Sequence, residues 1–295
     1  YTQLDGSVLP HLPCVFMLEA SISGSSANEF IPMVGTTFMG ISTQALNASK
    51  PVQIVLFGSQ ADSLVEAVQK HPNLSLVDTD PDVVLCYGGD GTLLAAELHW
   101  PGVPKVPVLN SRRGHRCIPH PVPDVLEGLA AGTLISNRYT KIEGEVYRDG
   151  KSITPESMVA LNEFNVHMGL INSAVRFQLS LNGDPYDDGV ELLGDGFVVC
   201  TPFGSTAYFA QITRGIFTRG IGIAFKSTNA HVDHLVVPDD TESRIRITRG
   251  PAVLAFDSAD EYVRLLEGDE LVVRKHAQCA TILTCGPVKQ LDEPF

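Results

Sequence analysis

Lysine and arginine are scarce in this 295-residue chain, and residues 1–49 contain neither. Lysine and arginine together number 21 against 34 aspartate and glutamate residues, which gives a formal net charge of −13 at pH 7. A protein that holds nucleic acid or anionic lipid over its whole surface needs the opposite sign of charge. We therefore expect no nucleic acid and no membrane as partners, and an anionic ligand would need a locally built site.

Long apolar runs and closely spaced cysteines are also missing. No stretch approaches the roughly 20 uninterrupted apolar residues of a membrane span. None of the six cysteines has the Cys-x-x-Cys spacing of a zinc or redox site, which favours a reduced, cytoplasmic protein. The histidines fit no zinc pattern either, so we expect no metal site built from protein ligands alone. The chain begins with Tyr1 rather than Met and has no basic leader, so we expect a fragment or processed form without a signal or transit peptide.

Length and composition indicate two folded domains. Single cores stop growing near ~250–300 residues, and domains usually hold about 100–200. Apolar residues make up 44% of the chain and charged residues 19%, which excludes disorder of the bulk. Residues 1–50 are hard to interpret and are assigned to an extension of unclear structure.

Between residues 51 and 132, short apolar runs alternate with helical stretches. Strands that are apolar throughout are buried on both faces, so this alternation predicts an α/β domain whose parallel sheet carries helices on both faces. The stretch Asp62-Ser63-Leu64-Val65-Glu66 contains a capping-box start, and Asp124 stands at capping-box spacing from Glu127, so both predict helix starts. The expected strands are 52–57, 74–77, 83–87 and 106–109, and the expected helices follow Asp62 or cover 93–99 and 124–131.

From about residue 133 to 275 the pattern becomes predominantly β. Asp149-Gly150 and Asn182-Gly183 are strong hairpin signals, and few helical periods separate the short runs around them. This predicts a β-rich second domain over 133–275, followed by a C-terminal tail over 276–295. The expected strands lie in 142–153, 176–181, 196–200, 235–237, 244–248, 252–256, 262–266 and 271–274.

A buried strand breaks into glycines at Gly88-Gly89-Asp90-Gly91-Thr92, just before a helix begins. Glycines at such a junction let backbone N–H groups approach an anion, and the helix N-terminus adds a favourable partial charge. Asp90 could take a proton from a hydroxyl or help to hold Mg²⁺. The pattern is neither the Walker motif nor Gly-x-Gly-x-x-Gly. A plain tight turn with Asp90 as a helix cap is the alternative interpretation.

A second loop, within residues 195–208, follows another apolar strand. After a Thr-Pro turn come Gly204 and three hydroxyl side chains in four residues. Such a loop can bind a polar ligand through backbone amides and hydroxyls, while the ring of Tyr208 offers a stacking surface. A glycine and serine turn followed by a capped helix is the alternative.

These two loops, in this order, resemble those of the NAD kinase family. Residues 88–92 are similar to the Gly-Gly-Asp-Gly-Thr signature that NAD kinases share with diacylglycerol and sphingosine kinases. Residues 195–208 are similar to a stretch typical of NAD kinases, differing at Phe203, where Thr is usual. Asn162-Glu163 resembles the family's Asn-Glu motif, and the likeness extends over about residues 52–273.

The resemblance implies an enzyme that phosphorylates the 2′-hydroxyl of the adenosine ribose of NAD, with ATP or polyphosphate as donor and a divalent metal such as Mg²⁺. It also implies a homo-oligomer whose ligands are small nucleotides. Asp90 is then the general base. The other implied contacts are Gly88, Gly89, Gly91 and Thr92 with donor phosphates, Asn162 and Glu163 with the adenosine half of NAD, Thr206, Ala207 and Tyr208 along the dinucleotide pocket, Asp195 on the nicotinamide side and Asp257 near the ribose.

Several positions depart from the family pattern. The loop 109–117 lacks the usual Leu-Gly-Phe-Leu and contains Arg112, Arg113 and Arg116, which either grip donor phosphates or belong to a solvated loop. Asp257 could equally be a hairpin-turn aspartate. Gln211 stands where a serine is usual, and Ser258 replaces a glycine, so the choice between NAD and NADH stays open. Two rivals remain: a lipid kinase of the diacylglycerol or sphingosine type, and a non-catalytic NAD(H)-binding sensor.

Overall fold

The structure is a computed structural model that describes residues 50–286 except 113, 115, 155 and 157. The extension expected over residues 1–50 therefore lies outside the described residues, apart from Lys50. No helix in the described part of the chain is long and apolar enough to cross a membrane.

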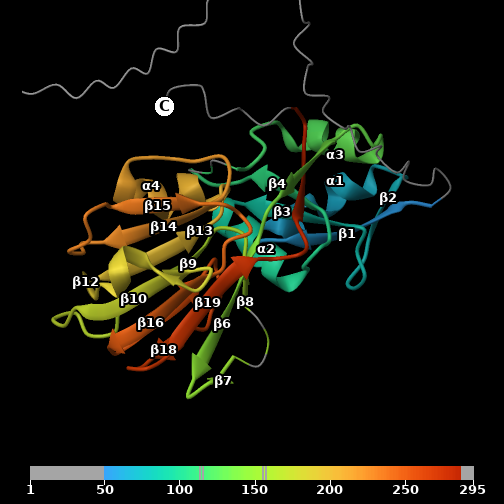
Figure 1. The fold of residues 1–295 in the computed structure, drawn as a ribbon. Helices are drawn as coiled ribbons and strands as arrows, with labels where there is room; N and C mark the ends of the chain where they lie inside the picture. The colour runs from blue at the N-terminus through green and yellow to red at the C-terminus, as the bar shows by residue number, and fades with distance from the viewer. Residues whose placement is uncertain (1–49, 113, 115, 155, 157, 287–295) are drawn as a thin grey trace, which may run out of the picture. The chain divides into compact units, whose positions relative to one another are not determined.

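A six-stranded sheet forms the α/β part of the fold (Figure 1). Its first four strands run parallel in the order β2, β1, β3 and β4, as the apolar runs predicted. The bounds are β1 (Val52–Phe57), β2 (Leu74–Leu76), β3 (Val83–Gly88) and β4 (Lys105–Leu109). The helical segments are the 3-10 turn η1 (Ala61–Leu64), α1 (Val65–Gln69), α2 (Asp90–His99) and α3 (Val122–Ala130).

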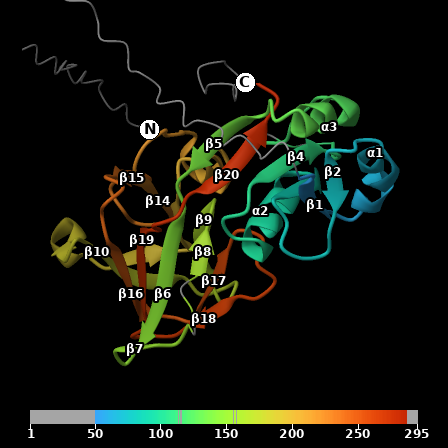
Figure 2. The ribbon, with the colours of Figure 1, turned by 90° about the vertical axis from the view of Figure 1, so that its right-hand side faces the viewer.

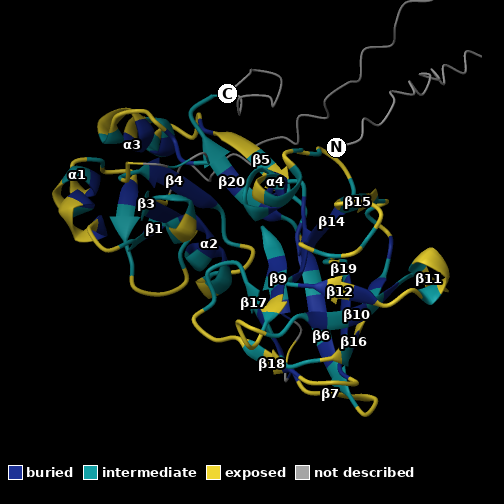
Figure 3. Cartoon of the chain, turned by 90° about the vertical axis from the view of Figure 1, so that its left-hand side faces the viewer, coloured by how far each residue is buried: buried dark blue, intermediate teal, exposed yellow. Residues whose placement is uncertain are grey.

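Helices cover both faces of this sheet, which confirms the predicted α/β architecture. Val84 and Cys86 of β3 share a buried cluster with Leu93 of α2. The neighbouring residue Leu85 belongs to another cluster, which includes side chains of α1 and α3 such as Leu126. Alternate residues of one strand thus contact opposite helix layers, because side chains alternate across a strand. Figure 3 shows dark-blue, buried segments on β4 and yellow, exposed parts on α1 and α3.

Both predicted helical segments form, but neither uses the predicted capping box. At the first, the chain forms η1 and then α1, and neither makes a side-chain cap hydrogen bond. Helix α3 begins at Val122, two residues before Asp124, and Pro123 lies in its first turn. Proline has the backbone angle of a first helical turn already set, so it moves the start of α3 ahead of the acidic residue.

The last described strand returns to the α/β sheet (Figure 2). Where the sequence analysis placed a tail, β20 (Ala280–Thr284) pairs in parallel with β4 and antiparallel with β5 (Ile135–Tyr139). Strand β5 reads Ile-Ser-Asn-Arg-Tyr, so it has no apolar run that would reveal it. The sheet therefore combines segments from both ends of the described chain, and the division into domains stays a prediction.

The second part is predominantly β, as predicted, and consists of two antiparallel sheets. One has the order β11-β10-β16-β19-β6-β7, with β12 and β8 attached, and the other has the order β15-β14-β13-β9-β17-β18. The first contains β6 (Ile142–Arg148), β7 (Lys151–Ser152), β8 (Met158–Ala160), β10 (Val175–Leu181), β11 (Asp184–Pro185), β12 (Leu192–Gly194), β16 (Ser243–Arg249) and β19 (Glu270–Lys275). The second contains β9 (Glu163–Met168), β13 (Gly196–Cys200), β14 (Ile221–Lys226), β15 (His234–Val237), β17 (Ala252–Phe256) and β18 (Val263–Leu265).

A single buried cluster joins these two sheets. Phe177 of β10 contacts Phe197 of β13 with ring centroids 4.7 Å apart, and both are buried within the cluster. The outer face of the second sheet is covered by α4 (Tyr208–Thr213), whose Phe209 packs with Val198 and Ala224. Both predicted hairpin dipeptides turn as expected, since Asp149, Gly150, Asn182 and Gly183 all have positive φ.

Candidate active site

Asp90 is the first residue of helix α2, at the end of the buried strand β3. The N-cap position belongs to Gly89 and not to Asp90, so the interpretation of Asp90 as a plain cap is not supported. A Cβ on Gly88 would lie 2.2 Å from the hydroxyl oxygen of Thr92, so only glycine fits between the strand and the helix. This close approach presents the backbone of the turn and the start of α2 together, as a phosphate-binding loop requires.

Two groups hold one carboxylate oxygen of Asp90. The backbone N–H of Arg116 donates to Oδ1 at 3.0 Å, and the thiol of Cys117 donates to the same oxygen at 3.6 Å. Burial first, then the charge of Asp90 and this hydrogen bond, raise the pKa of Cys117 to about 12. The thiol therefore stays protonated at neutral pH and serves as a donor rather than a nucleophile.

Arg116 also joins this loop to the second motif. Its Nη2 donates to the backbone oxygen of Phe203 at 2.9 Å and to Oγ1 of Thr206 at 3.1 Å. Burial lowers the pKa of Arg116, and Tyr139 and Asp90 oppose that shift. The structure thus brings Asp90, Arg116 and Thr206 together. Of the other two candidate arginines, Arg112 is exposed and Arg113 lies outside the described residues.

The loop after β13 is bonded to the Asn162-Glu163 motif through Thr201, which the sequence analysis did not single out. The backbone N–H of Thr201 donates to the oxygen of Asn162 at 2.9 Å, and its hydroxyl donates to the oxygen of Leu161 at 2.6 Å. A Cβ on Gly204 would lie 2.4 Å from the oxygen of Asn162, so glycine is required for this contact. The Thr-Pro turn before Gly204 was the only sequence signal for it. After the turn come η3 (Gly204–Thr206) and α4, with Ala207 as the N-cap of α4.

Asp257 anchors the same motif from the end of β17. Its carboxylate accepts the backbone N–H groups of Leu161 at 2.6 Å, Asn162 at 2.8 Å and Glu163 at 3.2 Å. Burial raises the pKa of Asp257 to about 6, against the lowering effect of these three donors. The next residue, Ser258, has its hydroxyl 3.8 Å from where a Cβ on Gly91 would be. The loop that holds Asn162-Glu163 therefore faces the start of α2.

Glu163 carries an unsatisfied carboxylate oxygen beside Asp257. Among the described residues its Oε2 is buried and has no hydrogen-bond partner. Burial, with a contribution from the charge of Asp257, raises the pKa of Glu163 to about 8. A buried acceptor without a partner is costly, so a ligand N–H or hydroxyl at this oxygen would be stabilised.

Asp195 and Tyr208 line a separate cavity of about 510 Å³ at the outer side of β14. Lys226, which the sequence analysis missed, donates from Nζ to Oδ1 of Asn165 at 2.7 Å and lies 5.6 Å from the ring centre of Tyr208. Burial lowers the pKa of Lys226 to about 8, although the charge of Asp195 opposes this. The cavity is polar, and Gln211, Ile212 and His231 are among its other lining residues.

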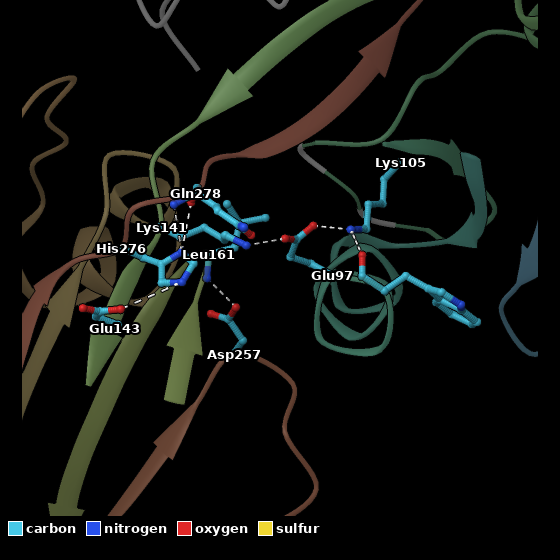
Figure 4. Close-up of polar contacts among 9 residues, drawn as sticks. Glu97, Lys105, Lys141, Glu143, Leu161, Asp257, His276 and Gln278 are labelled. Atoms are coloured by element: carbon cyan, nitrogen blue, oxygen red, sulfur yellow. Dashed lines mark hydrogen bonds and ion pairs between the residues drawn. The ribbon is translucent and has the colours of Figure 1, made fainter. Parts of the chain in front are cut away.

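A buried ion cluster lies at the other end of α2 (Figure 4). Glu97 pairs with Lys105 of β4 and, at 2.7 Å, with Lys141 just before β6. Lys105 also donates to the oxygen of Trp100 at 2.5 Å. None of the three charged side chains is more than 4% exposed. No sequence motif predicted this cluster, because its three members come from separate parts of the chain.

The geometry of the site and the known proteins similar to this chain indicate the same class of protein. A glycine turn that opens a helix after a parallel strand, with a carboxylate on the first helical residue, is the arrangement expected of a phosphotransferase that binds nucleotides. No family model matches the chain. The NAD kinase of Ralstonia nicotianae is 30% identical to it over 213 residues, which cover 68% of this chain and 68% of that protein. The NAD kinase of Chloroflexus aggregans is 29% identical over 222 residues, or 72% and 78% of the two chains. The chain therefore belongs to the NAD kinase family, as the motifs predicted.

Solved structures confirm the fold. The crystal structure of yeast NADH kinase complexed with NADH superposes with a TM-score of 0.69 at 17% identity, covering 80% of this chain and 84% of that one. An NAD kinase from Archaeoglobus fulgidus in complex with ATP gives 0.62 at 18% identity, covering 78% and 92%. At these identities the likeness shows the fold alone. The relatives named here give no support to the lipid-kinase or sensor alternatives.

Proposed function

We propose that the chain transfers a phosphoryl group to the 2′-hydroxyl of the adenosine ribose of NAD and so produces NADP. The observation that carries the proposal is Asp90, a carboxylate on the first residue of α2, with one oxygen held by the N–H of Arg116. In the transfer, the ribose oxygen bonds to the terminal phosphorus of the donor and the bond to the leaving phosphate breaks. The hydroxyl proton passes to Asp90 as general base.

The donor is ATP or polyphosphate, and its phosphates are assigned to the turn at Gly88, Gly89, Gly91 and Thr92. Backbone N–H groups and the N-terminus of α2 supply the partial positive charge there. Mg²⁺, when bound with the donor, neutralises charge on the phosphates. The described residues contain no group of three or more His, Cys, Asp or Glu side chains that could hold a metal. One carboxylate with substrate phosphates and water is a donor set that Mg²⁺ accepts, so Asp90 fits a metal that arrives with the nucleotide.

The dinucleotide is assigned to the Asn162-Glu163 loop, which faces this turn, and to the loop and cavity that follow β13. Asn162 and Glu163 would bind the adenosine half, and the unpartnered Oε2 of Glu163 supports that role. Thr206, Ala207 and Tyr208 would line the dinucleotide pocket, with Asp195 on the nicotinamide side of the cavity beside Tyr208. Asp257 would act on the ribose side mainly by holding Asn162 and Glu163 through their backbone N–H groups.

One assay tests the proposal directly. The protein is incubated with NAD, ATP and Mg²⁺, and NADP is detected with an NADP-specific dehydrogenase, next to Asp90→Ala and the matched exposed variant Asp124→Asn. We expect NADP from the wild type and from Asp124→Asn but not from Asp90→Ala. Equal signals from wild type and Asp90→Ala would sink the proposal, and binding of NAD without turnover would favour the sensor. Polyphosphate in place of ATP, NADH in place of NAD, and diacylglycerol as acceptor test the remaining choices.

A homo-oligomeric state, which the family resemblance implies, and a cytoplasmic location, which the cysteine spacing favours, belong to the same proposal. Light scattering after size exclusion, on the chain as it is, would measure the mass in solution. A mass equal to the 31.8 kDa of one chain would contradict the oligomer.

A further inference from the structure

One side chain connects the two loops of the candidate active site. Arg116 belongs to the loop after β4 and holds Asp90 through its backbone N–H at 3.0 Å. Its guanidinium reaches the loop after β13, where it donates to the oxygen of Phe203 and to the hydroxyl of Thr206. A displacement of this residue therefore acts on the proposed base and on the proposed dinucleotide pocket together.

An aromatic stack holds the guanidinium in place. The carbon at its centre lies 4.4 Å from the ring centre of Phe203, within the range of a cation–π contact. Tyr139 of β5 packs against Phe203 edge to face, with centroids 4.8 Å apart. Phe203 is only 5% exposed, so the ring cannot swing away without leaving a cavity. The two hydrogen bonds from Nη2 to Phe203 and Thr206 satisfy part of the donor set of this partly desolvated guanidinium, which would otherwise favour solvent.

Both partners of this stack are departures from the NAD kinase pattern. Arg116 lies in the altered loop 109–117, and Phe203 stands where threonine is usual. A threonine has no ring face for a guanidinium, and a lysine could not keep the planar, two-donor geometry seen here. The two departures therefore fit each other, although they lie 87 positions apart in the sequence.

We propose that Arg116 is a positioning residue that fixes Asp90 relative to Thr206, and that Phe203 is the platform that holds it. The proposal rests on the proposed function, since the geometry it sets is that of the phosphoryl transfer. A misplacement of about 1 Å costs an enzyme on the order of 10²-fold in rate. Arg116 would thus act through Asp90 and Thr206, and it would not itself contact the donor phosphates.

Steady-state kinetics on five variants test this. Arg116→Ala, Arg116→Lys, Phe203→Thr and the double variant Arg116→Ala/Phe203→Thr are compared with Arg138→Ala, an exposed arginine on β5 outside the site. For Arg116→Ala we expect kcat to fall by about 10–100-fold and KM for NAD to rise, with KM for ATP within about twofold. Arg116→Lys should recover part of the loss, because it keeps the charge. The double variant should be no worse than Arg116→Ala, because Phe203 acts through Arg116.

Three outcomes would overturn the proposal. They are an unchanged kcat in Arg116→Ala, losses in the two single variants that multiply in the double variant, and a rise in KM for ATP that exceeds the loss in kcat. The last result would make Arg116 a phosphate contact. If the wild type makes no NADP, the proposed function fails instead. The coupling between Arg116 and Phe203 is then judged from the urea midpoints of the same variants, where additive shifts would reject it. Arg116→Lys and Phe203→Thr keep both tests available should Arg116→Ala not fold.

Discussion

Helix α2 carries two carboxylates, and their surroundings differ. Asp90 is its first residue and Glu97 its eighth. With about 3.6 residues per turn, a spacing of seven places both side chains on one face of the helix. Glu97 is 4% exposed and pairs with two buried lysine ammonium groups, Lys105 and Lys141. At this end of the helix the buried carboxylate is held in place by ion pairs with two buried ammonium groups.

The other end is arranged differently. The Oδ1 atom of Asp90 accepts hydrogen bonds from the backbone N–H of Arg116 and from the thiol of Cys117. The glycines around it leave the backbone of the turn accessible to a ligand. We propose that Glu97 serves stability and that Asp90, on the same helix, serves the phosphoryl transfer, and substitutions should separate these two roles.

The largest effect on turnover is expected at Asp90, at the N-terminal end of α2. Replacing Asp90 with asparagine removes the proton acceptor but keeps the shape, so kcat should fall by about 10²–10⁴-fold. The unfolding free energy should change by no more than about 0.5 kcal/mol. NADP formation and urea unfolding measure the two quantities. If Asp90→Asn kept a tenth of the wild-type kcat, or if its unfolding free energy fell along with kcat, Asp90 would not have a role in turnover that is separate from stability.

The largest effect on stability is expected at Glu97, near the C-terminal end of α2. Glu97→Ala leaves two buried ammonium groups without their carboxylate, which should cost about 3–5 kcal/mol of unfolding free energy. Glu127→Ala, an exposed glutamate of α3, serves as the control and should cost about 0.5 kcal/mol or less. Urea unfolding followed by circular dichroism gives both numbers. A loss at Glu97 no larger than at Glu127 would mean that the cluster is not an ion-pair network in solution.

How far the sequence predicted these features depends on how local their signals are. Strands 52–57 and 83–87 were predicted because a buried parallel strand is a continuous apolar run. The Asp90 turn was predicted because its glycines are consecutive. The pairing of β20 with β4 and β5 was not, since β5 is polar and its partner lies far along the chain.

Side-chain roles that depend on distant partners were also beyond the sequence. Glu97 was missed because Lys141 lies 44 positions away and no pattern links them. Asp257 was singled out by resemblance, but its three backbone donors appear only in the fold. Lys226 and Thr201 likewise acquire their partners through strand pairing, which brings separate loops together.

Glu163 has a buried carboxylate oxygen with no hydrogen-bond partner among the described residues, in contrast to Glu97, which pairs with two lysines. The pKa of Glu163 is raised to about 8, first by burial and then by Asp257, whose own pKa is raised to about 6. Both exceed the unfolded values, so between about pH 4 and pH 8 the native state holds more protons than the unfolded one. Stability then falls as pH rises through this window. Glu163→Gln removes the contribution of Glu163 to this pH dependence. Between pH 5 and pH 8, its free energy of unfolding should therefore rise relative to that of the wild type by on the order of 2 kcal/mol.

Urea unfolding at several pH values measures this gain, with the exposed Glu261→Gln as control. A constant difference between Glu163→Gln and wild type across the range would show that Glu163 titrates normally. Saturating NAD should reduce the pH dependence of the wild type, if a ligand donor pairs with Oε2 of Glu163, because a hydrogen bond to the charged form favours that form.

The smallest effect is expected when the whole ion cluster is replaced at once. Glu97→Leu, Lys105→Met and Lys141→Met together remove both the ion pairs and the cost of burying their charges. Apolar replacement of buried ion pairs is often neutral or stabilising by about 1–4 kcal/mol, so the triple variant should be at least about as stable as the wild type. Because Asp90 lies about two turns away, kcat measured on the folded triple variant should stay close to that of the wild type. A large fall in kcat with stability intact would mean that the cluster also sets the orientation of α2, and the two ends of the helix would then share one role.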